Sequence, residues 1–206
     1  MNSRTIATVS LGTGIASGIL DLFDNVIEWE TGAKYDAIHF EGGGDIHPSI
    51  YGCRNTDSHV NEVASGRDRL EIRAMTEAIR QGALIIGSCR GAQLACALAG
   101  GKLVQDVTNH TSQHSITTVD GTEFMATSVH HQQMYPWDID HDLLAWSTSN
   151  RSDHYHGDNI SSDAVILEPE AVYFPTIHAL GFQWHPEWAV SSDELEFTIK
   201  TILRHL

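Results

Sequence analysis

A cysteine, a histidine and a glutamate in this sequence stand in patterns suited to nucleophilic catalysis. Cys89 lies within Gly87-x-Cys89-x-Gly91, between a short apolar run and an alanine-rich run, which is the strand–turn–helix pattern of a nucleophile elbow. At a helix N-terminus, the macrodipole and the free N–H groups favour a thiolate. His185 and Glu187 follow a second apolar run. Such a pair can supply a general base and the carboxylate that orients its ring.

The sequence also predicts how these groups meet. Residues i and i+2 of an extended chain project to the same side, so His185 and Glu187 would face each other. Pro186 between them restricts φ and would hold that spacing. The N–H of Arg90, at the start of the helix, would lie beside the sulfur and could stabilise an oxyanion. Together these groups indicate acyl transfer through a covalent intermediate.

Each motif has a structural interpretation as well. A cysteine between two glycines is often a small buried apolar side chain, and His-Pro-Glu after a strand can be a loop corner. A third feature favours catalysis. Gly42-Gly43-Gly44 follows another apolar run, and glycines at the end of a strand let backbone N–H groups approach a ligand. Three such motifs in one chain are improbable as a coincidence.

Strands and helices alternate in the first half of the predicted structure. Apolar or alternating runs predict strands at residues 5–11, 25–29, 36–41, 83–86, 143–148, 164–168, 171–174 and 178–183, and a hairpin across 115–127. Periodic spacing predicts helices at 67–81, between the elbow and Gly100, and at 191–206, after a short helix that ends near Phe23. Gly12 and Gly14 indicate a plain turn, and residues 150–162 a polar loop. This order predicts an α/β three-layer sandwich with a mainly parallel central sheet, formed by residues 1–206 as a single domain.

Composition excludes several classes of partner. The 206 residues carry 12 lysines and arginines against 27 aspartates and glutamates, a net charge of −15, which disfavours nucleic acid and anionic membranes. Three cysteines at irregular spacing indicate neither a disulfide framework nor a zinc ribbon. Because no signal peptide or membrane-length apolar run is apparent, we expect a cytoplasmic protein.

Five segments of the chain resemble the class I glutamine amidotransferases. The chain is most similar to their γ-glutamyl hydrolase branch, which includes the γ-glutamyl-γ-aminobutyrate hydrolases. The resemblance implies a flavodoxin-like fold and a reaction that needs no cofactor or metal. The matching segments occur in the family's order, at residues 41–52, 87–93, 128–132, 170–172 and 181–188.

The resemblance implies roles for three residues in amide hydrolysis. Cys89 would be the nucleophile, His185 the base and acid, and Glu187 the group that orients the imidazole. The substrate would be glutamine or another small γ-glutamyl amide. Glu41 stands where the family usually has proline, and residues 150–162 match no family pattern, so the leaving amine is undefined.

The same resemblance implies groups that would hold the substrate. The backbone N–H groups of Arg90 and of the Gly42–Gly43 pair would bind the oxyanion. Gln93, one helical turn after the nucleophile, would hold the glutamyl end. His131 would line the same pocket.

Three functions are compatible with the sequence alone. The first is a free-standing hydrolase of γ-glutamyl amides, which the Arg90 and His-His-Gln features favour. The second is a glutaminase subunit that delivers ammonia to a separate synthetase or ligase chain. The third is a non-enzymatic metal-binding module built from the 13 histidines, with His130-His131 and His154-x-His156 as ligands, although no established zinc spacing supports it. The sequence does not define the oligomeric state, for which a homodimer is one alternative.

Overall fold

The computed structural model describes residues 3–9, 14–160 and 167–206. Parts of four predicted features lie outside these ranges. They are residues 10–11 of the first strand, Gly12 of the turn that follows, residues 161–162 of the polar loop, and residues 164–166 of the strand predicted at 164–168.

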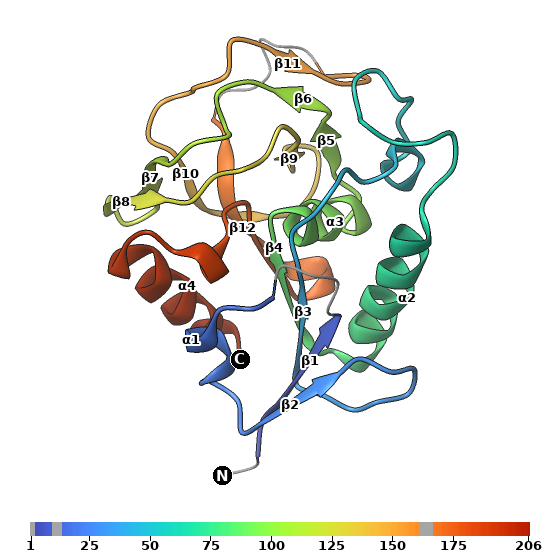
Figure 1. Cartoon of the computed structure of the whole chain (residues 1–206), viewed down its shortest axis with the longest axis vertical. Helices are drawn as coiled ribbons and strands as arrows, with labels where there is room; N and C mark the ends of the chain where they lie inside the picture. Colours follow the sequence, from blue (N-terminus) through green and yellow to red (C-terminus); the bar gives the residue numbers. More distant parts are fainter. Residues whose placement is uncertain (1–2, 10–13, 161–166) are drawn as a thin grey trace.

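The centre of the molecule is a nine-stranded sheet in the order β2-β1-β3-β4-β13-β12-β10-β7-β8 (Figure 1). Its first five strands are parallel: β2 (Asn25–Glu28), β1 (Thr5–Val9), β3 (Ala37–Phe40), β4 (Leu84–Ser88) and β13 (Ala179–Phe182). The other four extend the sheet in antiparallel pairing: β12 (Pro169–Phe174), β10 (Asp142–Ser147), β7 (His114–Thr118) and β8 (Glu123–Ala126). The parallel half carries the candidate site, and the antiparallel half contains the predicted hairpin.

Two further strand pairs lie beyond this sheet, at the top of the view in Figure 1. β5 (Lys102–Val104) pairs with β9 (Gln133–Tyr135), and β6 (Asp106–Val107) pairs with β11 (Tyr155–His156). The sequence analysis did not predict β9 or β11. Both are two or three residues long, so neither shows the periodicity on which strand prediction depends.

Helices cover both faces of the sheet, as predicted for a three-layer sandwich. α2 (Gly66–Gln81) and α3 (Arg90–Leu98) pack on one face, in a core that includes Met75, Ile85 and Leu94. α1 (Ser17–Leu20) and α4 (Ser192–His205) pack on the other, in a core that includes Ile19, Phe182 and Ile202. Among the described residues, no helix combines the length and the apolar character needed to cross a membrane.

The start of α2 is stabilised by a reciprocal cap. The Ser65 hydroxyl accepts the Asp68 N–H at 3.0 Å, and an Asp68 carboxylate oxygen accepts the Ser65 N–H at 2.7 Å. Gly82 ends the helix in a left-handed conformation at φ 70°. This cap holds Asp68 in place for a second contact, described below.

Candidate active site

The turn between β4 and α3 has the geometry of a nucleophile elbow. Cys89 adopts φ 49° and ψ −105°, a backbone conformation that is strained for a residue with a side chain. Its N–H donates to the Phe182 carbonyl of β13 at 2.7 Å, which holds the strained residue at the edge of the sheet. A Cβ on Gly87 would lie 2.3 Å from the Gly91 carbonyl carbon, so the turn can close only with glycine at residue 87. A Cβ on Gly91 would lie 2.3 Å from the Phe40 carbonyl oxygen, so glycine there lets α3 pack against the end of β3.

His185 contacts both partners that the sequence analysis assigned to it. Its Nδ1 lies 2.7 Å from a Glu187 carboxylate oxygen, and its ring lies near enough to the Cys89 side chain for that group to influence its pKa. Burial lowers the pKa of His185, but the interactions with Cys89 and Glu187 raise it, with the result at about 9. The imidazolium form of His185 is therefore favoured at neutral pH.

The local reason for the His185–Glu187 contact differs from the one predicted. Pro186–Trp188 form a short 3-10 helix, so the pair is joined by a tight turn and not by an extended segment. His185 precedes this turn at φ −112° and ψ 87°, and the turn brings Glu187 back to the imidazole. The Trp188 ring stacks on the His185 ring at a centroid distance of 4.3 Å and covers one face of the imidazole. Trp184, by contrast, is buried in the core and takes no part in the pocket wall.

The Gly42–Gly43 segment, directly after β3, lies against the base. A Cβ on Gly42 would lie 2.4 Å from His185 Cε1, so the histidine occupies the space a side chain would need. An Arg67 guanidinium nitrogen donates to the Gly42 carbonyl at 2.9 Å and to the Glu41 carbonyl at 3.3 Å. In a trans peptide the C=O and the next N–H point in opposite directions. The Gly43 N–H is therefore turned away from Arg67, and Gly43 lines the pocket that holds the sulfur.

A buried ion cluster supports the elbow from behind. The Arg90 guanidinium donates to Asp68 at 2.5 Å and pairs with Glu71, and all three side chains are at most 2% exposed. Glu71 also accepts Arg67 Nε at 2.8 Å. Burial lowers the pKa of Arg90 to about 10, which leaves the guanidinium charged at neutral pH. The cluster ties the first turns of α2 to the residue that follows Cys89.

A pocket of about 290 Å³ opens beside the sulfur. Two predicted substrate-binding residues, Gln93 and His131, line it together with Cys89 and Gly43. The Gln93 amide donates to the Gln132 carbonyl at 2.9 Å, so part of its hydrogen-bonding capacity is already used. The full lining is Gly43, Gly44, Asp45, His59, Cys89, Gln93, Val129, His130, His131 and Gln132.

Comparison with known proteins identifies the family. Residues 29–187 match the sequence profile of peptidase C26, which is most of the chain and includes Cys89, His185 and Glu187. The chain belongs to the peptidase C26 family. This membership agrees with the resemblance to class I glutamine amidotransferases, and one of the relatives described next is named glutamine amidotransferase-like.

Two relatives align with most of this C26 protein. The glutamine amidotransferase-like protein YvdE of Lactococcus lactis is 28% identical over 173 residues, which cover 74% of this chain and 66% of YvdE. The chain thus spans just under two thirds of that relative's length. Protein NtpR of Enterococcus hirae is 26% identical over 173 residues, which cover 79% of this chain and 71% of NtpR.

Solved structures share the fold at low sequence identity. A glutamine amidotransferase from Thermotoga maritima superposes with a TM-score of 0.60 at 11% identity, covering 99% of this chain and 84% of the other. The structure of PurLQS from the same organism gives 0.60 at 14% identity, covering 98% and 100%. These matches confirm the predicted flavodoxin-like α/β fold.

Sequence reasoning missed several groups that surround the candidate site of this C26 protein. The sequence analysis places Arg67 only at the start of a helix, although its spacing from Glu71 fits an i,i+4 ion pair and is a usable signal. The position of Asp45 and His59 in the pocket had no local signal, because His59 lies in an irregular segment.

A buried histidine network behind the pocket was also missed. His114 Nε2 lies 2.9 Å and His110 Nδ1 3.5 Å from the same Glu170 carboxylate oxygen, and His110 Nε2 lies 3.1 Å from Glu168. His130 packs against His110 with ring centroids 4.7 Å apart. Burial keeps the pKa of His130 well below its ordinary value, so it lines the pocket as a neutral imidazole.

Proposed function

We propose that this C26 protein hydrolyses a γ-glutamyl amide through a thioester on Cys89 and releases glutamate and an amine. One observation carries the proposal. The imidazole of His185 hydrogen-bonds through Nδ1 to Glu187 at 2.7 Å and interacts with the Cys89 side chain, which lines a pocket together with Gly43 and Gly44. Nucleophile, base and orienting carboxylate then have the mutual arrangement that acyl transfer requires.

The first half of the reaction forms the thioester. The Cys89 thiolate attacks the γ-carbonyl carbon, and the π electrons of the carbonyl move to its oxygen. The Arg90 and Gly43 N–H groups would bind that oxyanion. When the oxyanion collapses, the C–N bond breaks and the imidazolium of His185 gives its proton to the departing amine. Glu187 stabilises the imidazolium and holds its ring in place.

The second half restores the enzyme. A water molecule gives a proton to the neutral His185 and attacks the thioester carbonyl. The C–S bond then breaks, glutamate leaves, and the thiolate–imidazolium pair reforms. The pocket of about 290 Å³ has room for a small γ-glutamyl group.

Ammonia delivery to a partner chain is the second candidate function. It is supported by the structural likeness to PurLQS of Thermotoga maritima. In that case the leaving group is the ammonia of glutamine, and activity without the partner is low. A non-enzymatic metal-binding module has less support, because metal binding alone does not explain why Cys89, His185 and Glu187 lie together.

A substrate screen separates the two enzymatic candidates. Purified protein is incubated with glutamine, γ-glutamyl peptides and γ-glutamyl polyamine conjugates, and glutamate release is measured with a coupled glutamate dehydrogenase assay. We expect at least one γ-glutamyl amide with a leaving amine larger than ammonia to be hydrolysed faster than glutamine. Cleavage of glutamine alone would favour the ammonia-delivering subunit. No release from any of these compounds would contradict both candidates.

Arg67 is a positioning residue in this proposal, and its replacement tests the oxyanion site. Arg67→Met removes the hydrogen bonds to the Glu41 and Gly42 carbonyls. We expect kcat on the best substrate of the screen to fall about 10- to 100-fold, less than the loss of a complete oxyanion donor, with a smaller change in KM. Steady-state kinetics measure both quantities.

Arg69→Met is the matched control on the same helix. Arg69 is exposed, and its guanidinium donates to the Ala64 carbonyl, away from the glycine segment. This variant should retain the kcat of the unaltered protein. Equal losses of kcat in the two variants would contradict a specific role for Arg67.

A further inference from the structure

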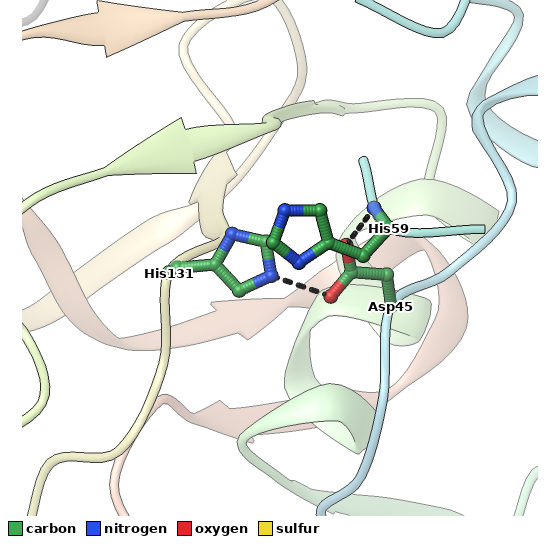
Figure 2. A group of neighbouring side chains, drawn as sticks. All are labelled: Asp45, His59 and His131. Atoms are coloured by element: carbon green, nitrogen blue, oxygen red, sulfur yellow. Dashed lines mark hydrogen bonds and ion pairs between the residues drawn. The ribbon is translucent and has the colours of Figure 1, made fainter. Parts of the chain in front are cut away.

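Two imidazoles and a carboxylate converge at the wall of the Cys89 pocket. Figure 2 shows Asp45 between the backbone of His59 and the ring of His131, with the two rings stacked above one another. His131 Nε2 lies 2.8 Å from an Asp45 oxygen, and the ring centroids of His59 and His131 are 4.5 Å apart. One ligand atom from each of the three residues lies within 4.8 Å of the other two.

The residues around this group orient its members as metal ligands are oriented in proteins. His131 Nδ1 lies 3.3 Å from Asp106, whose other oxygen lies 2.6 Å from His154 Nε2. A carboxylate on one ring nitrogen fixes the orientation of an imidazole and raises the basicity of its other nitrogen, which in His131 is the Nε2 that faces Asp45. The second Asp45 oxygen accepts the His59 backbone N–H at 2.7 Å, so the aspartate is fixed by the same segment that carries His59.

The spacing and the atom types favour a particular class of ion. Bonds of about 2.0–2.1 Å in a tetrahedral zinc site place ligand atoms about 3.3 Å apart, between the 2.8 Å contact and the 4.8 Å limit seen here. Two nitrogens and one carboxylate oxygen suit Zn²⁺ and its neighbours better than Mg²⁺ or Ca²⁺, which prefer oxygen ligands.

We propose that Asp45, His59 and His131 form a binding site for a divalent transition-metal ion of the Zn²⁺ type. Three protein ligands would leave a fourth coordination position open, and all three residues line the same pocket as Cys89. An ion and the substrate would therefore share one cavity. The proposal concerns binding alone and does not depend on the proposed hydrolase activity.

Calorimetry with Zn²⁺ tests the site on protein that cannot bind the ion through the nucleophile. Tag-free Cys89→Ala protein, treated with a chelator and dialysed, is titrated with zinc chloride. We expect one ion per chain, and an affinity at least tenfold weaker in the additional His59→Ala and Asp45→Asn variants. His59 is exposed, so its replacement should leave the fold intact, and far-ultraviolet circular dichroism checks this.

His156→Ala is the matched control, and it also separates this site from its neighbour. His156 stacks on His154 and belongs to a second group with Asp106, in which ligand atoms also lie within 4.8 Å of one another. This variant should bind Zn²⁺ as tightly as its parent. Absence of binding in the parent, or binding that survives in His59→Ala, would overturn the proposal. The latter result would place the ion in the Asp106 group or in the buried His110, His130 and Glu170 group.

Discussion

Replacing Cys89 with alanine is expected to abolish glutamate release while leaving the fold intact. The proposed reaction passes through a bond to this sulfur, and no other cysteine lines the pocket of the described structure. Loss of the nucleophile in an enzyme of this kind lowers kcat by about 10⁴-fold or more. Alanine removes the sulfur without adding atoms, so the backbone of the elbow should keep its conformation.

Two measurements check this expectation. Glutamate release from the best substrate of the screen gives the rate, and mass spectrometry of the intact, acid-quenched protein detects a γ-glutamyl adduct on the unaltered enzyme and none on the variant. Cys53→Ala serves as the control, because Cys53 lies outside the pocket and should be dispensable. Undiminished turnover by Cys89→Ala would refute the assignment of the nucleophile.

His185 should behave as part of the same unit. His185→Asn removes the acid and base, and the double variant with Cys89→Ala should be no slower than either single variant, because groups that act in one step are strongly non-additive. Additive losses would show that the two residues act independently and would contradict the proposed mechanism.

Replacing Arg90 with methionine is expected to lower the free energy of unfolding by about 3–5 kcal/mol. The arginine is the buried partner of Asp68 and Glu71, so methionine fills much of its volume but leaves carboxylates without their cation. Breaking a buried ion pair from one side has a cost of this size, because the remaining charge is held away from water. Arg67 still neutralises part of the Glu71 charge, whereas Asp68 keeps only its cap contacts to Ser65.

Urea denaturation followed by circular dichroism measures the loss. Lys200→Met is the matched control, since Lys200 pairs with Glu196 on α4 and the two side chains are 62% and 57% exposed. Solvent screens that pair, so its removal should not measurably shift the denaturation midpoint. Equal midpoint shifts in the two variants would contradict the inference that the Arg90 cluster stabilises the elbow through buried charge.

The parts of the site that local patterns could predict are those built within a few consecutive residues. The elbow is one of them, because Gly87 is required by contacts with Gly91 and Ala92 inside a single turn, although the space beside Gly91 is taken by Phe40 of β3. The helix over 67–81 is another, since its apolar spacing and its Ser65 cap are properties of one segment, and the structure has it as Gly66–Gln81. Alternating runs likewise predicted the parallel strands, whose pairing brings the end of β3 beside that of β4.

The resemblance to a known family supplied what local patterns could not. His185 and Cys89 are almost a hundred residues apart. The presence of both motifs in one chain indicated a joint site, and their order, which is that of the family, supported it. The proximity of the two residues follows from the parallel pairing of β13 with β4, which places Phe182 opposite Ser88. Both strands therefore end at the same edge of the sheet, and Cys89 and His185 follow them there. The turn that joins His185 to Glu187 was predicted as extended and proved to be 3-10.

The sequence by itself therefore determined the order of strands and helices, the strained turn at Cys89 and the chemical types of the candidate residues. Tertiary structure alone decided that Arg67 holds the glycine segment and that Asp45, His59 and His131 converge. The physical reason is the range of the interactions. Periodicity, capping and steric conflict act within one or two turns of chain, whereas ion pairs and ligand sets form between segments whose approach depends on how the whole sheet is assembled.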